Sequence, residues 1–186
     1  MMNSFPEKEH YMSWSAEKNE SCPTCEFQGN LNILREIYFF SALPIDTLKV
    51  FAFLCTRENF KPGEYLFTQE DDDGQAFYLI SGEAALIRSD SGGEEIIRNY
   101  TAGDFSGALT LLGNTRRLFS LKASTPVTCL ILSRERFVHA MDQYPQLMSS
   151  IFHAVVERIH HWEEHFLSER SEGCNACKQK IGVSLI

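Results

Sequence analysis

Short apolar segments separated by turn residues fill the chain between Phe60 and Leu132, and they constrain the fold more than any other feature. Apolar and polar residues alternate in places, which is typical of strands with one buried face. Many short strands joined by glycine-rich turns predict a sandwich or a barrel. The expected strands are 65–68, 76–80, 83–88, 95–100, 119–123 and 127–132, with turn signals at 61–64, 81–82 and 91–93.

Helical patterns flank this region on both sides. Apolar residues recur at helical spacing from Leu31 to Phe40, and a second helix from Ile45 to Cys55 follows a proline. After the last strand, Ser133 is placed to cap a helix at 134–143. A longer helix then starts at Pro145.

The longer helix carries two apolar stripes. One stripe repeats at alternating spacings of four and three residues, which is a heptad seam, and the second can face the barrel. A helix of this kind needs two partners; one broad stripe buried within a monomer is the alternative. The seam is Met148, Phe152, Val155, Ile159, Trp162 and Phe166, and the second stripe is Leu147, Ile151 and Val156.

The stretch from Gly103 to Ala123 contains a candidate anion site. Gly107 precedes a short apolar run, and a glycine at a helix start lets backbone N–H groups approach an anion. A nearby arginine can hold that anion with two hydrogen bonds. The residues predict a phosphate cradle made of the amides around Gly107 to Leu109 and of Arg117 or Arg116. An ordinary loop with surface arginines is the alternative.

This stretch resembles the phosphate-binding cassette of cyclic nucleotide-binding domains, a family that includes bacterial catabolite-activator proteins and regulatory domains of kinases and channels. The cassette runs GDxFGEhAhh, a variable turn and R-[ST]-A-[ST]-V-x-A, where h is apolar. The resemblance extends from about Phe39 to about Phe166. The matching residues are Gly103, Asp104, Phe105, Gly107, Leu109, Leu111, Leu112, Arg117, Ser120 and Ala123.

The resemblance implies the fold and the division of the chain. The family's form is mainly β: a double-stranded β-helix, or jelly-roll-like β-roll, with flanking helices and a long C-terminal helix that dimerises in bacterial members. We therefore expect a homodimer formed through the helix from Pro145 to Phe166. The expected units are a leader at 1–29, a cyclic nucleotide-binding-like domain at 30–168 and a tail at 169–186. Within the domain we expect a helical pair at 30–55, the β-roll at 56–132 and the C-terminal helices at 133–168.

The departures from the family pattern fall on the ligand contacts. The glutamate that holds the ribose 2′-hydroxyl in the family is Ala108 here, and the small hydroxyl residue after the arginine is Leu118. Phe119 replaces a small residue, and Trp162 falls near a threonine that contacts the base in bacterial members. We therefore expect weak binding of ordinary cAMP. The ligand-binding set implied by the resemblance is Gly107, Ala108, Leu109, Arg117, Leu118, Phe119 and Trp162.

Two CxxC pairs bracket the expected domain. Four thiolates suit a tetrahedral zinc ion or an iron–sulfur cluster, and two unrelated thiol pairs are the alternative. The candidate metal ligands are Cys22, Cys25, Cys174 and Cys177. The remaining cysteines, Cys55 and Cys129, lie in apolar surroundings and are predicted to be core residues.

Several functions are disfavoured by composition and spacing. A net charge of −8 argues against a nucleic-acid surface, and too few residues follow the long helix for a helix-turn-helix domain, so we expect no direct DNA binding. No apolar run reaches the length of a membrane span or forms a signal core, which favours a soluble cytoplasmic protein without a membrane partner. The acidic run from Glu70 to Asp73 is interpreted as a solvated turn. No histidine lies among the expected strands, which argues against a metal-dependent enzyme of the cupin kind.

Three functions remain. The first is a non-enzymatic regulatory module that senses a cyclic nucleotide or another small anion and takes part in signal transduction. The second is a thiol-based redox sensor holding zinc or an iron–sulfur cluster. The third is a degenerate domain that serves only protein association.

Overall fold

Two antiparallel sheets of four strands each form the centre of the structure, a computed structural model that describes residues 23–169. The strands are β1 (Thr56–Phe60), β2 (Tyr65–Phe67), β3 (Gln75–Ser81), β4 (Ala84–Asp90), β5 (Gly93–Tyr100), β6 (Phe105–Ser106), β7 (Ser120–Ala123) and β8 (Val127–Ser133). One sheet has the order β1-β8-β3-β6 and the other β2-β7-β4-β5. The predicted β-roll with flanking helices is confirmed.

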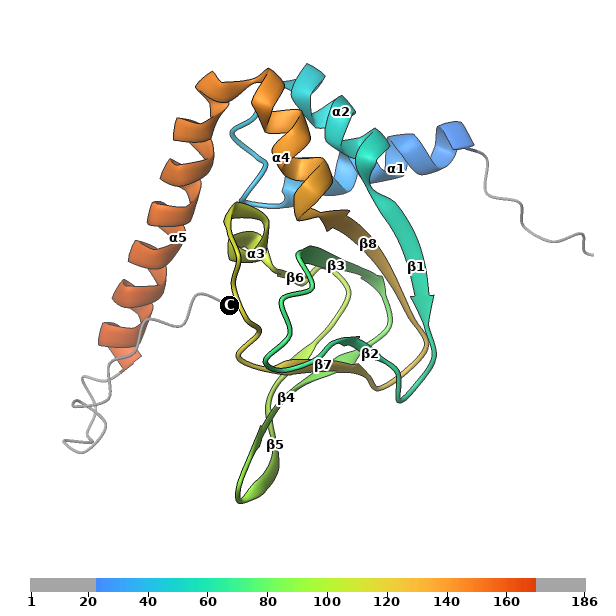
Figure 1. Ribbon diagram of the computed structural model, residues 1–186, viewed down its shortest axis with the longest axis vertical. Helices are drawn as coiled ribbons and strands as arrows, with labels where there is room; N and C mark the ends of the chain where they lie inside the picture. Colours follow the sequence, from blue (N-terminus) through green and yellow to red (C-terminus); the bar gives the residue numbers. More distant parts are fainter. Residues whose placement is uncertain (1–22, 170–186) are drawn as a thin grey trace, which may run out of the picture.

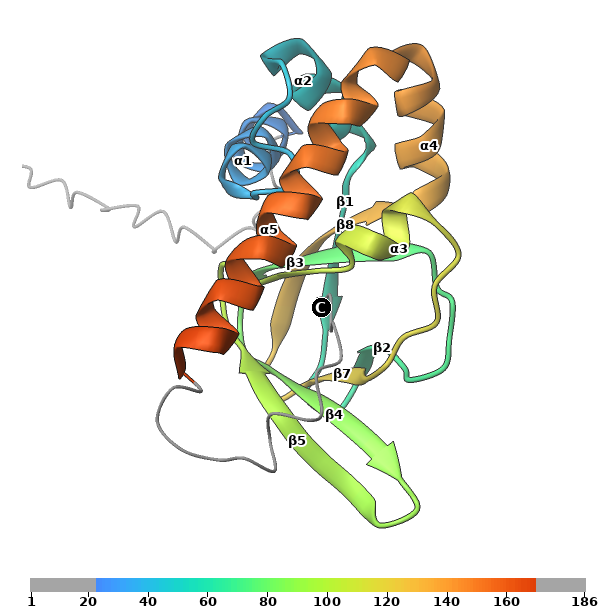
Figure 2. The ribbon, with the colours of Figure 1, turned by 90° about the vertical axis from the view of Figure 1, so that its left-hand side faces the viewer.

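The helices lie mostly at one end of the roll, and the last one runs from there along the side of the roll (Figures 1 and 2). They are α1 (Pro23–Glu36), α2 (Ile45–Leu54), α3 (Ala108–Leu112), α4 (Arg134–Gln143), the 3₁₀ turn η1 (Pro145–Leu147) and α5 (Met148–Glu169). Figures 1 and 2 show α1, α2 and α4 together at this end, while the β4–β5 hairpin projects from the opposite end. The predicted cap of α4 is confirmed, because Oγ of Ser133 accepts a hydrogen bond from the backbone N–H of Arg136 at 3.3 Å. Within residues 23–169, no helix is long and apolar enough to cross a membrane.

The core has two parts, one inside the roll and one under the helices. Inside the roll, Leu79 and Leu121 from the two sheets are fully buried in one cluster. Under the helices, Phe51 of α2 stacks on Phe137 of α4 with 5.5 Å between ring centroids. Leu111 belongs to this second cluster, so burial of α3 fixes this short helix at the boundary between the roll and the helices.

Three local predictions differ from the structure. The first helix begins at Pro23, well before the predicted start at Leu31, and ends at Glu36. Strand β1 was not predicted, because its sequence TRENF is polar and mostly exposed; it pairs with β8 along its whole length. Strand β6 has only two residues and carries too little pattern to be recognised.

The predicted division of α5 into two stripes is wrong. Val155, assigned to the dimer seam, is 8% exposed and packs with the fully buried Ile151 in the helical cluster. Val156, assigned to the inward stripe, is 59% exposed, and Phe152 of the seam is 55% exposed. The inward face therefore includes Ile151 and Val155, and the outward apolar face consists of Phe152 and Val156.

Candidate ligand-binding site

A cavity of about 270 Å³ opens beside α3, between this helix and the β-roll. It is bounded by residues of β2, β4, β6 and α3 and of the loop that follows α3. Its walls are mainly apolar, with a few polar groups, which is usual for small-molecule sites. The lining residues are Phe67, Leu86, Ser106, Gly107, Leu109, Thr110, Thr115, Arg116, Arg117, Leu118 and Phe119.

Gly107 turns the chain from β6 into α3. Its φ of +98° lies in the left-handed region that side chains rarely adopt. A Cβ atom there would lie 2.6 Å from the carbonyl oxygen of Gln75 and 2.8 Å from Cα of Ala76. Only glycine therefore allows α3 to begin so close to β3, at the edge of the cavity.

Arg117 is the buried cation of the cavity, at 6% exposure. Its Nε donates to Oδ1 of Asp73 at 3.1 Å, and its Nη2 donates to Oδ1 and Oδ2 at 2.8 and 3.0 Å. Nη2 also donates to the carbonyl oxygen of Gln75. The guanidinium lies over the ring of Phe67, 4.0 Å from its centroid, which adds a cation–π contact. The side chain is thus held in one orientation before any ligand arrives.

Burial and the carboxylate of Asp73 act in opposite directions on this guanidinium. Burial lowers the pKa of Arg117, and the charge of Asp73 raises it. An arginine stays protonated under such conditions, so Arg117 remains a charged donor that is ion-paired with Asp73. Nη1 of Arg117 donates no hydrogen bond to any of residues 23–169. This nitrogen is a buried donor still available to a ligand.

The acidic loop between β2 and β3 keeps Glu70, Asp71 and Asp72 exposed, as expected of a solvated turn, but the loop also binds Arg117. Asp73 holds Arg117, as described, and two backbone hydrogen bonds of 2.8 Å join the same loop to Arg117: Glu70 N–H to Arg117 O, and Arg117 N–H to Asp71 O. Glu70 has a φ of +69° where it makes this contact. The loop and Arg117 therefore form one unit.

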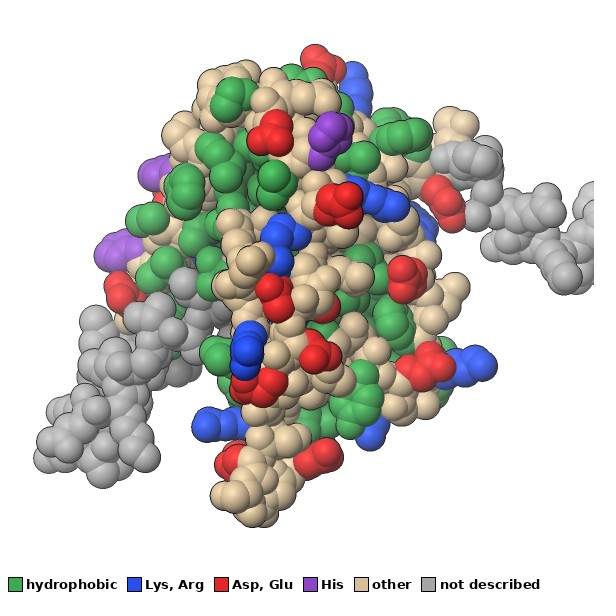
Figure 3. All heavy atoms as spheres, in the orientation of Figure 1, with side chains coloured by type: hydrophobic (Ala, Val, Ile, Leu, Met, Phe, Trp, Pro, Cys, Tyr) green, Lys and Arg blue, Asp and Glu red, His purple; other side chains and the backbone are tan. Residues whose placement is uncertain are grey.

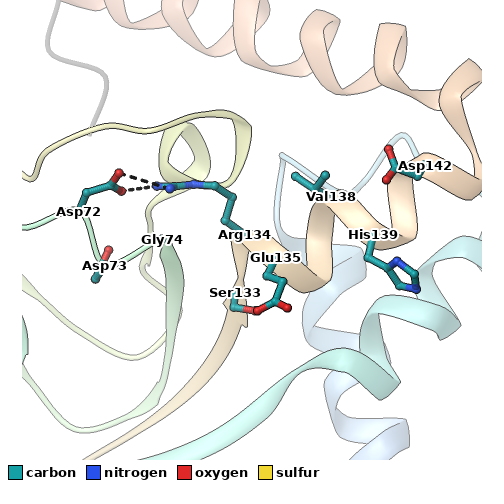
Figure 4. Close-up of a pocket in the computed structure, with 9 residues that line it drawn as sticks. All are labelled: Asp72, Asp73, Gly74, Ser133, Arg134, Glu135, Val138, His139 and Asp142. Carbon is teal, nitrogen blue, oxygen red and sulfur yellow. Dashed lines mark hydrogen bonds and ion pairs between the residues drawn. The ribbon is translucent and has the colours of Figure 1, made fainter.

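Asp72 ties the loop to α4 as well (Figure 4). Arg134, the first residue of α4, donates through Nη2 to Asp72 and through Nε to the carbonyl oxygen of Thr110 in α3. Nη1 of Arg134 donates to Asn114 at 2.7 Å. The hydrogen bond from Arg134 is the main cause of the lowered pKa of Asp72. A second, open cavity of about 530 Å³ lies along this network, and Figure 4 shows His139 and Asp142 of α4 at its far side.

Comparison with known proteins shows which family of domains this arrangement resembles. Residues 57–144 match the family described as the cyclic nucleotide-binding domain. These residues belong to the cyclic nucleotide-binding domain family. The cAMP-dependent protein kinase regulatory subunit of Emericella nidulans is 36% identical over 117 residues, which are 62% of this chain and 27% of that protein. The chain spans about a quarter of the length of the curated relatives it matches.

Solved structures show the same fold. The N-terminal domain of a transcriptional regulator from Streptomyces coelicolor aligns with a TM-score of 0.64 at 20% identity, covering 72% of this chain and 93% of that one. The regulatory subunit of a cAMP-independent protein kinase A from Trypanosoma brucei aligns with a TM-score of 0.54 at 21% identity, covering 67% of this chain and 46% of that one.

Most of the predicted ligand-binding residues lie together around the cavity beside α3. Gly107, Leu109, Arg117, Leu118 and Phe119 all line the cavity. Leu118 is 59% exposed at its margin, and Phe119 packs against the core of the roll.

Two predicted ligand-binding residues lie elsewhere. Ala108 is buried in the helical cluster, outside the lining of the cavity, and it has no side-chain group that could accept a hydrogen bond from a ribose. Trp162 is half-buried on α5 and does not line the cavity. The role of Trp162 against a base stays a prediction.

The proposed metal ligands fall mostly outside the structure. Cys22, Cys174 and Cys177 lie outside the described residues, and Cys25 is exposed on α1. Within residues 23–169, no group of three or more histidine, cysteine or carboxylate side chains is placed to hold a metal ion. The four-cysteine site therefore stays a prediction.

The two other cysteines are inert thiols. Burial raises the pKa of Cys55 and of Cys129 to about 12 in each case. A thiol with such a pKa is almost never a thiolate at neutral pH, which agrees with the predicted role of both as core residues.

Proposed function

We propose that this cyclic nucleotide-binding domain is a non-enzymatic regulatory module that binds a small phosphate-bearing ligand in the cavity beside α3. The observation that carries this proposal is that Arg117, a buried cation among the residues that line the cavity, makes no hydrogen bond through Nη1 to any described residue. Leaving such a donor unpaired is costly, and a ligand anion would pair it. The open cavity favours this function over a degenerate domain whose pocket is filled by its own side chains.

The same site is poorly equipped for the ribose of cAMP. The lining residues of the cavity include no carboxylate, and Ala108 offers no acceptor for the 2′-hydroxyl. A hydrogen bond to a charged group typically contributes about 1.5–3 kcal/mol. Without it, cAMP should bind about ten- to hundredfold more weakly than at a site that has the carboxylate. The same fold occurs in the Trypanosoma brucei protein, which is described as the regulatory subunit of a cAMP-independent protein kinase A.

Two conservative substitutions at adjacent arginines test the proposal. Arg117→Lys keeps a positive charge beside Asp73 but removes the guanidinium group, and with it the Nη1 donor. Arg116→Lys is the matched control, because Arg116 lines the same cavity but is exposed, and its Nη1 lies 3.8 Å from Oε2 of Glu70. Both variants are titrated by calorimetry with cAMP, cGMP and cyclic dinucleotides.

Arg117→Lys should weaken binding at least tenfold, while Arg116→Lys should change it less than threefold. Equal losses in the two variants would show that the anion does not meet Arg117. Failure of every probe to bind wild-type protein at millimolar concentration would overturn the proposed function itself.

We propose further that the domain forms a homodimer through the outward apolar face of α5. Phe152 and Val156 are both more than half exposed and lie one turn apart. Figure 3 shows hydrophobic side chains gathered on the surface over α5 and the neighbouring helices. Exposed apolar faces of this kind are typical of association surfaces.

Light scattering tests the dimer. Phe152→Glu combined with Val156→Glu should give a monomer with unchanged helical content. His161→Glu is the control, because it adds a negative charge at an exposed position of α5 that lies about 140° or more around the helix from Phe152 and Val156, and it should leave the dimer intact. A monomeric wild-type protein would contradict the proposal.

A further inference from the structure

Thr110 carries a buried hydroxyl that the sequence analysis did not single out. The residue is 4% exposed and lines the cavity beside α3. No donor or acceptor among residues 23–169 lies within hydrogen-bond distance of its Oγ1. Helical serine and threonine side chains usually donate to a carbonyl oxygen three or four residues earlier, as Ser149 does to Gln146 at 3.3 Å in α5. Thr110 makes no such bond.

The orientation of α3 explains why this hydroxyl is left without a partner. Ala108, Leu109, Leu111 and Leu112 all contact the helical cluster. Thr110 is the one remaining residue of this five-residue helix, and the carbonyl oxygen of Gly107 already accepts a hydrogen bond from Leu111 N–H at 3.3 Å. Thr110 is thus the one polar side chain of α3, and it lines the cavity together with Leu109.

Thr110 therefore shares the cavity with a second orphaned donor, Nη1 of Arg117. Both side chains are more than nine-tenths buried, and both residues line the same cavity. The backbone of Thr110 is fixed independently, because its carbonyl oxygen accepts a hydrogen bond from Nε of Arg134. The cassette pattern has alanine where this chain has Thr110, so the hydroxyl is a departure from that pattern.

We propose that Oγ1 of Thr110 and Nη1 of Arg117 form a two-donor site for the phosphate group of the ligand. This inference rests on the proposed function, and it supplies a hydroxyl in place of the one that the family pattern has where this chain has Leu118. A phosphate presents several acceptor oxygens, so it can pair a neutral hydroxyl donor and a guanidinium donor at the same time. A neutral ligand satisfies the two donors less well, because a guanidinium donates a stronger hydrogen bond to a charged phosphate oxygen than to a neutral acceptor.

Thr110→Val is the decisive variant, since valine keeps the shape of the side chain and removes only the hydroxyl. Thr110→Ser is the matched control that keeps the hydroxyl. Neither change touches the backbone contact to Arg134. Each protein is measured twice: by urea denaturation without ligand, and by calorimetric titration with cAMP, AMP and inorganic phosphate.

Without ligand, Thr110→Val should be at least as stable as wild type, because a buried hydroxyl without a partner does not stabilise the fold. With ligand, it should bind the tightest of the three probes about tenfold more weakly, whereas Thr110→Ser should stay within threefold of wild type. Wild-type affinity in Thr110→Val would overturn this inference and leave the proposed function intact. Loss of stability in ligand-free Thr110→Val would overturn it too, because the hydroxyl would then have an internal partner. No binding of any probe to wild type would overturn both.

Discussion

Two glycines of the cassette offer a matched test of how tightly α3 is fixed against the roll. Gly103 and Gly107 share a φ of +98°, but only Gly107 lies against other backbone atoms. A Cβ atom at Gly103 would have nothing within 4 Å, whereas one at Gly107 would lie 2.6 Å from the carbonyl oxygen of Gln75. Gly103→Ala should therefore cost only the strain of a left-handed alanine, about 1 kcal/mol. Gly107→Ala should add an overpacking cost of about 2 kcal/mol, because β3 is bonded on both edges and cannot move freely.

Urea denaturation followed by circular dichroism measures both variants. The expected losses in the free energy of unfolding are about 1 kcal/mol for Gly103→Ala and about 3 kcal/mol for Gly107→Ala, with unchanged slopes. Gly107→Ala should also weaken ligand binding, since α3 must shift away from β3. Equal losses in the two variants would refute the reasoning, because they would show that β3 yields to the added methyl group at little cost.

Two further predictions concern α5 and the acidic loop. Ile151→Ala should destabilise the domain by about 2–5 kcal/mol in urea denaturation, because Ile151 is fully buried. Glu157→Ala on the exposed face should change the free energy of unfolding by less than about 0.5 kcal/mol. Equal losses of stability in the two variants would show that Ile151 does not belong to the inward face of α5. The hydrogen bond from Arg134 lowers the pKa of Asp72 in the folded protein. The ionised Asp72 therefore stabilises the fold above the ordinary aspartate pKa of about 3.9, and this stabilisation is lost as the pH falls through the lowered pKa of the folded state. Asp72→Asn should therefore reduce the loss of stability between about pH 5 and pH 2, and an unchanged acid profile would contradict this role.

The parts of the site that could be predicted from the sequence are those set by local chain geometry. Gly107 and Arg117 stand at fixed offsets around a short apolar run, and both line the cavity as expected. The role of Asp73 could not be predicted in the same way, because it precedes Arg117 by 44 residues and meets it only through the pairing of the strands. A run of carboxylates is usually solvated, so the charge pattern pointed away from this contact.

The inward and outward faces of α5 and the unpaired, buried hydroxyl of Thr110 could not be predicted from the sequence either. Apolar residues stand side by side at 151–152 and at 155–156, so a heptad and a helical stripe fit almost equally well. The structure resolves this through the crossing of α5 over the helical cluster, which buries Val155 and leaves Val156 exposed. The hydroxyl of Thr110 differs from an ordinary helical threonine only in lacking a partner, which no sequence pattern reveals.

The central claim is that the domain retains the phosphate half of the site and lacks recognition of the ribose 2′-hydroxyl. Calorimetric titration of the wild-type protein with cAMP and with 2′-deoxy-cAMP tests it most directly, because the two ligands differ only in that hydroxyl. A site that bonds a ligand hydroxyl discriminates strongly against the analogue that lacks it, and a site without a partner does not. We predict saturable binding of both ligands with dissociation constants within about threefold of each other, and at least tenfold weaker binding of both to Arg117→Lys. A preference for cAMP of about tenfold or more would contradict the account, as would failure of both ligands to bind.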